Sequence, residues 1–412
     1  MTVLAALAAV LIVGQNPQPL TPQSCVKAGN DFAAKRQNEF EKLTGDAIRQ
    51  IDAERVEIVR RCAASLDIER ASADDLAALV ELYTESQQPD LAERVIERGL
   101  TATMTPANRA AFLNQAVRFL LRQPKSDARN ARAEEYISAL DALPDDYFDQ
   151  KLIAHAALNS YYRGDDIDAG IMRHSTWILR TVPRLTPEQR KRFALALIAA
   201  YTYQAAVLAG QGENDRALDL LTRAPKELSD IPGVERRVSP DLARYRLVGT
   251  RAAPIQAPVW LNASEGTRTL DMGGAVTLLQ FTAHWCGPCR ESYPGIQRLR
   301  SRFSGRPFRV IFVTQLYGYF EKERDLPAEQ EIERDRRYFR DLGLDVPVAI
   351  TPRAEDAAAS NGPDNEAAYH VNGIPQINII DARGRVRLIM IGYDDANELK
   401  LAEVIEKLLG EK

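Results

Sequence analysis

The sequence predicts a multidomain chain in which an N-terminal all-α domain of helical repeats is followed by an α/β domain. Between residues 65 and 230, apolar side chains recur at helical spacing in one segment after another. After residue 250, short apolar strands alternate with amphipathic helices. A third observation indicates a reactive site in the second domain: Cys286 and Cys289 follow one of these strands, with only two residues between them.

The length and charge of the chain indicate a multidomain protein that does not bind nucleic acid. A chain of 412 residues allows two or three domains, each with its own core. The 53 basic and 57 acidic residues leave a net charge of only −4. Binding of nucleic acid needs a concentrated basic excess, so we predict no nucleic-acid partner.

Residues 1–14 are predicted to be a signal peptide. Val3 to Val13 is an unbroken apolar run, shorter than the roughly 20 residues that cross a bilayer. It suits the apolar region of a secretory signal, and the polar, proline-bearing residues 15–22 suit the segment that follows one. No Lys or Arg precedes the run, so a misplaced start codon or a short core helix is the alternative. We expect an extracytoplasmic protein, located in a bacterial periplasm.

Residues 23–64 are predicted to form a helical hairpin closed by a disulfide between Cys25 and Cys62. A single helix between these cysteines would hold them about 54 Å apart, whereas a disulfide needs Cα atoms within about 7 Å. Gly45 and Asp46 can end one helix and begin the next. The apolar positions also continue through Gly45 in helical phase, so one long helix with two free thiols is the alternative.

Residues 65–230 are predicted to form an α-solenoid, because pairs of short helices bury their apolar faces only by stacking. Asp90-Leu91-Ala92-Glu93-Arg94-Val95 and Asp215-Arg216-Ala217-Leu218-Asp219-Leu220 resemble the second helix of tetratricopeptide repeats. That resemblance implies a protein ligand on the helical domain. Residues 231–250 carry prolines and few apolar repeats, and we interpret them as a linker.

Residues 251–412 are predicted to form the α/β domain, in which a sheet is covered on both faces. Strands are expected near 257–261, 267–270, 276–282, 308–314, 346–350, 376–380 and 385–391. Helices are expected near 288–303, 328–342, 364–370 and 395–409.

The two cysteines of this domain have the spacing of a redox-active dithiol. Cys286 would lie at the N-terminus of a helix, where unpaired backbone N–H groups and the helix dipole favour a thiolate. In such motifs the pKa of the first thiol falls from about 8.5 to roughly 3.5–7.5. Cys289, one helical turn later, would act as the resolving thiol. Gly287 allows a tight turn, and Pro288 suits the first helical turn.

Other uses of the motif fit the sequence less well. Zinc binding would need a second pair of ligands at matched spacing, which neither the four histidines nor the other two cysteines provide. Covalent haem attachment would need histidine after Cys289, where the chain has Arg290. We therefore expect no metal and no cofactor beyond the redox-active disulfide itself.

The residues around the motif resemble a known family. Trp285-Cys286-Gly287-Pro288-Cys289 after an apolar strand, Pro294 within the helix and Gly373-Ile374-Pro375 before another strand look like the thioredoxin fold. Residues 250–412 more closely resemble the exported TlpA/ResA-like thiol-disulfide oxidoreductases. The opening Ala257-Pro258-Val259-Trp260-Leu261 and the charged helical insert at 328–342 carry that resemblance.

The chain departs from the family at three positions. Gln280 stands where thioredoxins carry a buried carboxylate, which leaves the group that deprotonates Cys289 unassigned. Ser292 stands where the exported branch usually has glutamate, and Glu291 lies one position early. His284 precedes Trp285, and we interpret it as an exposed turn residue, with tuning of the thiolate as the alternative.

The resemblance implies that Cys286 and Cys289 reduce disulfides of exported proteins and are recharged by a membrane thiol electron donor. It also implies a cis bond at Ile374–Pro375, with Trp285, Ile374 and Pro375 binding the substrate chain. The alternative to an enzyme is a binding protein: a helical-repeat scaffold or chaperone-like binding module with an accessory redox domain. An oxidase or isomerase is a third reading.

Overall fold

The structure is a computed structural model that describes residues 20–39, 45–164, 167–353, 364–393 and 395–411. The chain forms two compact units, residues 1–157 and residues 158–412. The predicted signal peptide, residues 1–14, lies outside the described residues. Within the described ranges, no helix is both long enough and apolar enough to cross a membrane.

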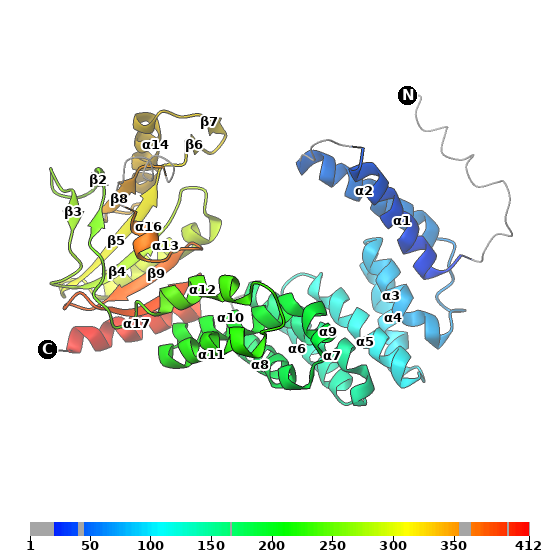
Figure 1. Ribbon diagram of the computed structural model, residues 1–412. Coiled ribbons are helices and arrows are strands. Elements are labelled where there is room, and N and C mark those ends of the chain that lie inside the picture. The colour runs from blue at the N-terminus through cyan, green and yellow to red at the C-terminus, as the bar shows by residue number, and fades with distance from the viewer. Residues whose placement is uncertain (1–19, 40–44, 165–166, 354–363, 394, 412) are drawn as a thin grey trace, which may run out of the picture. The chain divides into compact units, whose positions relative to one another are not determined.

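The first unit consists of helices packed against their neighbours in the chain (Figure 1). Capping residues begin several of them: the Thr105 side chain accepts a hydrogen bond from Asn108 N at 3.2 Å, and Ser126 accepts one from Arg129 N. The helices are α1 (Pro22–Gln37), α2 (Gly45–Ala63), α3 (Leu76–Glu85), α4 (Pro89–Thr101), α5 (Pro106–Leu121) and α6 (Asp127–Asp141), with 3-10 turns at Ala73–Asp75 and Asp145–Tyr147. Helix α7 (Phe148–Gly164) begins in this unit and continues past its boundary at residue 157.

A disulfide joins the first two helices. Cys25 in α1 and Cys62 in α2 are bonded, with their Cα atoms 5.5 Å apart. The helices approach closely beside it, since a Cβ atom at Gly29 would lie 2.4 Å from Cγ2 of Val59. Residues 23–64 therefore form two packed helices rather than one long helix.

The second unit begins with more helices, so the boundary at residue 157 falls inside the range 65–230 that we predicted as one domain. Helix α10 packs against α8, α11 and α12 and also against strand β10 (Val386–Ile391), which joins these helices to the sheet. The helices are α8 (Asp168–Thr181), α9 (Pro187–Arg192), α10 (Ala194–Gly210), α11 (Asn214–Glu227) and α12 (Val234–Tyr245), with a 3-10 turn at Val182–Arg184.

The prediction of a linker at 231–250 is wrong. Residues 234–245 form α12, which buries Val234, Val238 and Tyr245 against its neighbours. Pro240 lies inside this helix, and the Ser239 hydroxyl donates a hydrogen bond at 3.2 Å to the carbonyl of Arg236, which Pro240 cannot serve. We gave the prolines too much weight and overlooked the helical spacing of the apolar residues.

The chain after α12 is also held in place. The backbone N–H of Gly249 donates to Val386 O at 2.7 Å, and Ala252 N donates to Gly384 O at 2.8 Å. This segment therefore runs along the sheet edge formed by β10 before it reaches the first strand of the α/β domain.

The α/β domain contains a six-stranded mixed sheet in the order β10-β9-β4-β5-β8-β2 (Figure 1). Strands β4, β5 and β8 are parallel, whereas β9, β10 and β2 pair antiparallel with their neighbours. The strands are β2 (Val259–Leu261), β4 (Val276–Phe281), β5 (Phe308–Gln315), β8 (Val348–Thr351), β9 (Gln376–Ile380) and β10; β1 (Ile255–Gln256) pairs with β3 (Thr269–Leu270), and β6 (Tyr319–Phe320) with β7 (Glu323–Arg324).

Separate apolar clusters cover the two faces of the sheet. Leu278 and Phe312 belong to the cluster that includes residues of α13 (Gly287–Arg302) and α17 (Asp395–Gly410). Leu279 and Val313 belong to the other cluster, which includes Tyr369 and residues before β2. Two further helices are α14 (Ala328–Asp341) and α16 (Asn365–Ala368). The predicted strands and helices of this domain agree closely with these bounds, while β1, β6 and β7 were not predicted.

The disulfide of the first unit should stabilise it measurably. Closing a loop across 37 residues restricts the unfolded chain, so we expect Cys25→Ala/Cys62→Ala to lower the free energy of unfolding by about 2–4 kcal/mol. Urea unfolding under oxidising conditions, followed by circular dichroism, would measure the difference. Equal midpoints for the variant and the wild type would show that the bridge contributes nothing.

Candidate active site

The Cys286–Cys289 pair lies where β4 passes into α13. Cys286 occupies the N-cap position of α13, and its Sγ accepts a hydrogen bond from Cys289 N at 3.2 Å. Gly287 begins the helix and Pro288 occupies its first turn, where a missing N–H leaves no bond unmade. The start of the helix therefore supplies a backbone N–H group to the sulfur of Cys286.

The structure contains the oxidised form of the motif, with a disulfide between Cys286 and Cys289. Both side chains are almost fully covered, Cys286 at 3% exposure and Cys289 at 0%. Trp285 beside them is 47% exposed. Of the two cysteines, Cys286 is thus the one that keeps some exposure, as expected of the attacking residue.

The loop before β9 faces this disulfide. The Ile374–Pro375 peptide bond is cis, as the resemblance implies, and the carbonyl oxygen of Ile374 lies 3.8 Å from Sγ of Cys286. Antiparallel pairing of Phe281 with Gln376 brings the two segments together. The structure therefore assembles the predicted residues Trp285, Cys286, Cys289, Ile374 and Pro375 at one place, whereas Cys25 and Cys62 lie in the first unit.

Neutral groups surround the buried cysteine. The Ser292 hydroxyl donates to Cys289 O at 2.6 Å, and Gln280 Nε2 donates to Ser292 Oγ at 3.0 Å. All three side chains are fully buried. Gln280, which stands where thioredoxins carry a carboxylate, thus contacts the helix through a neutral amide. Glu291, which lies one position before the glutamate of the exported branch, is exposed.

Buried acids come from the α14 insert instead. The Glu331 carboxylate accepts hydrogen bonds from Tyr317 N at 2.6 Å and Gly318 N at 2.8 Å. Asp335, one turn later, is buried, and its Oδ2 contacts no hydrogen-bond partner among the described residues. Burial, together with the charge of Glu331, raises the pKa of Asp335 to about 7.

His284 is buried, so our prediction of an exposed turn residue is wrong. Its ring stacks on Phe320 at a centroid distance of 4.6 Å and meets the edges of Tyr317 and Tyr319. Burial lowers the pKa of His284 to about 4, although a hydrogen bond with the Tyr319 backbone acts in the opposite direction. The sequence does not show this environment, because the aromatic residues lie about 35 positions later.

The aromatic segment and the buried acids are the residues that sequence reasoning missed. Two signals could have revealed them. The run Tyr317-Gly318-Tyr319-Phe320 directly follows a core strand, where loops often carry functional residues. Glu331 and Asp335 are also four positions apart, which places them on the same helix face as Phe339.

Comparisons with known proteins relate part of the chain to redox proteins. No model of a known family matches it. Mouse nucleoredoxin is 26% identical over 156 residues, 35% of this chain and 30% of nucleoredoxin. Thioredoxin-like protein YneN of Bacillus subtilis is 24% identical over 139 residues, 34% of this chain and 69% of YneN. The crystal structure of a thiol-disulfide isomerase from Corynebacterium glutamicum covers 40% of this chain and 98% of its own, with 22% identity and a TM-score of 0.32.

The chain therefore spans about 30% of the length of nucleoredoxin. The matched third of the chain is similar to thioredoxin-like redox proteins. The relatives, together with the sheet order and the cysteine pair, support an oxidoreductase function.

The environment of His284 predicts a pH-dependent loss of stability. The pKa of this side chain is about 4 in the folded protein and about 6.5 in an unfolded chain. Between these values the unfolded chain binds more protons, so lowering the pH favours unfolding. We expect the wild type to lose stability relative to His284→Phe as the pH falls from about 6.5 to about 4, with no further divergence below. Urea midpoints across this range would measure it, and a constant difference would contradict it.

Proposed function

We propose that the protein is an exported thiol-disulfide oxidoreductase of the TlpA/ResA type that reduces protein disulfides. The observation that supports this most directly is the Cys286–Cys289 pair at the start of α13, with Cys286 Sγ 3.8 Å from the carbonyl of Ile374. A reactive sulfur beside an extended backbone segment suits a substrate that is itself a polypeptide.

The reaction proceeds in two exchanges. In the reduced enzyme, the Cys286 thiolate attacks one sulfur of a substrate disulfide; the substrate S–S bond breaks, a Cys286–substrate disulfide forms, and one substrate thiolate leaves and takes a proton from water. Cys289 then gives up its proton to water, and its thiolate attacks Cys286 Sγ; the Cys286–substrate bond breaks, and the second substrate thiolate leaves and takes up a proton. Two electrons have moved to the substrate, and Cys286 and Cys289 are again joined.

The surrounding residues take defined parts in this sequence. Backbone N–H groups at the start of α13 stabilise the Cys286 thiolate, since they carry the positive end of the helix dipole. Ile374 offers its backbone to the extended substrate chain, and Pro375 shapes the groove beside it. Trp285, which is half-exposed, contributes to the docking surface.

The direction of electron flow is part of the proposal. Gly287-Pro288 is the dipeptide between the cysteines of thioredoxin, whose reduction potential is about −270 mV, against about −120 mV for the oxidant DsbA. We infer a reductase in a periplasm, recharged by a membrane thiol donor. The apolar run at the N-terminus and the resemblance to exported oxidoreductases support this location.

Substitution of each cysteine tests the chemistry. Cys286→Ser should abolish reduction of a protein disulfide, because it removes the attacking sulfur. Cys289→Ser should stop the reaction at the mixed disulfide, which non-reducing electrophoresis and mass spectrometry would detect. Cys25→Ala/Cys62→Ala serves as the matched control and should retain activity. Full reduction by Cys286→Ser would refute the mechanism.

The reduction potential of the Cys286/Cys289 pair tests the direction. Equilibration of the full chain with glutathione or dithiothreitol buffers, read by alkylation, should give a value near thioredoxin's roughly −270 mV. A value near that of DsbA, roughly −120 mV, would mean that the protein works as an oxidase, with electrons flowing the other way.

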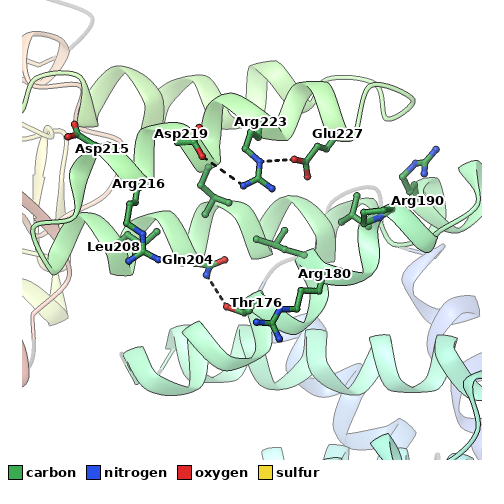
Figure 2. A pocket seen from close by; sticks show the side chains of 14 residues that line it. Thr176, Arg180, Arg190, Gln204, Leu208, Asp215, Arg216, Asp219, Arg223 and Glu227 are labelled. Carbon is green, nitrogen blue, oxygen red and sulfur yellow. Dashed lines mark hydrogen bonds and ion pairs between the residues drawn. The ribbon is translucent and has the colours of Figure 1, made fainter.

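A second candidate function comes from the helical part of the second unit. A cavity of about 850 Å³ lies among α8, α10 and α11, with Leu179, Val182 and Leu208 in its lining. Figure 2 shows Arg223 between Asp219 and Glu227, which it contacts at 3.9 and 2.7 Å. No carboxylate of the described residues pairs with Arg180. We propose that the cavity holds an acidic, partly apolar segment of a client polypeptide, in a tetratricopeptide-like manner.

Client binding at the cavity can be tested independently of the redox reaction. The test compares the KM for a client protein disulfide with the KM for a small disulfide such as hydroxyethyl disulfide. Arg180→Glu should raise the ratio of these two KM values by roughly tenfold, because a charge-assisted contact contributes about 1.5 kcal/mol or more. Arg237→Glu, an exposed arginine outside this lining, is the matched control. An unchanged KM ratio would count against client binding at this cavity.

A further inference from the structure

The segment from Leu316 to Leu326 lies beside the redox motif without a part in the chemistry described above. It follows β5 and contains the short hairpin β6–β7, seen next to α14 in Figure 1. Tyr317, Tyr319 and Phe320 are all partly exposed. Three aromatic rings within four residues form more apolar surface than a connecting turn needs.

The segment is held firmly at several points. The Glu331 carboxylate accepts from the backbone N–H groups of Tyr317 and Gly318, and Leu326 N donates to Gly318 O at 3.0 Å, which closes its base. Arg334 in α14 pairs with Glu323 at 3.0 Å. A surface fixed in this way loses little conformational entropy when it binds a ligand.

Two residues join the segment to the redox motif. His284 stacks on Phe320 with ring planes 23° apart. Trp285, the next residue, meets the Tyr317 ring edge-on at 5.5 Å and 82°. Because His284 and Trp285 directly precede Cys286, these contacts set the position of the aromatic segment relative to the attacking sulfur.

We propose that Tyr317 and Trp285 form an apolar platform for the side chain of a large apolar residue next to the substrate cysteine, and that His284 is the positioning residue that aligns this platform with Cys286. The inference rests on the proposed function. Its chemistry follows from the surface: the partly exposed rings are aromatic, and Trp285, which packs against Tyr317, directly precedes the reacting cysteine. Arg324 lies over the neighbouring Tyr319 ring at 4.7 Å, and the charge of Glu366 acts on Tyr317 from the side of α16. An aliphatic or aromatic side chain is favoured there, because its burial displaces water from apolar rings.

Two peptide substrates test the platform. Each is a peptide–glutathione mixed disulfide; one carries phenylalanine and the other serine beside the cysteine. With the reduced full-length protein, we expect kcat/KM to favour the phenylalanine peptide by roughly tenfold, and Tyr317→Ala to reduce this preference to roughly twofold or less. Tyr147→Ala, a partly exposed tyrosine of the other unit, should keep the wild-type preference. Because the preference compares two peptides on one preparation, a misfolded fraction of enzyme cancels.

The positioning role has its own readout. His284→Ala should lower the preference for the phenylalanine peptide mainly through KM, whereas His284→Phe, which keeps a ring against Phe320, should restore it. Two results would overturn the inference and leave the proposed function standing. One is a wild type that reduces both peptides equally well, and the other is an unchanged preference in Tyr317→Ala. A wild type that reduces neither peptide nor any protein disulfide would overturn the proposed function itself.

Discussion

The antiparallel pairing of β4 with β9 is the constraint on which the site depends. It places Phe281 opposite Gln376, so the turn that leaves β4 and the loop that enters β9 meet at one edge of the sheet. Every residue of β4 and β9 is buried, which makes a slip of register costly because it would exchange the residues of the two faces. The proximity of Cys286 to Ile374 follows from this register.

Neutral groups dominate the surroundings of the sulfurs. Gln280 and Ser292 secure the first turn of α13 without charge, and His284 is uncharged at neutral pH because burial lowers its pKa. The backbone N–H groups at the start of the helix are therefore the principal stabilisers of a Cys286 thiolate. Asp335 in α14 is buried beside Glu331, which raises its pKa to about 7.

The helical parts differ in how they are secured. In the first unit, a disulfide joins α1 and α2, which restricts the unfolded chain as well as the folded one. In the second unit, α10 packs against β10 and the segment after α12 pairs with the same edge of the sheet. Helices α8–α12 and the thioredoxin-like domain therefore belong to one compact body, and the cavity among α8, α10 and α11 is part of it.

The sequence by itself determined the local features of this protein. The strand–turn–helix around Cys286, the helices of the first unit and nearly all strands of the α/β domain follow from apolar spacing and capping residues, which act over a few positions. Tertiary structure decided what depends on distant partners: the burial of His284 under Phe320 and the raised pKa of Asp335. Burial and side-chain contacts across tens of residues have no periodic signature in the chain, so only the folded arrangement reveals them.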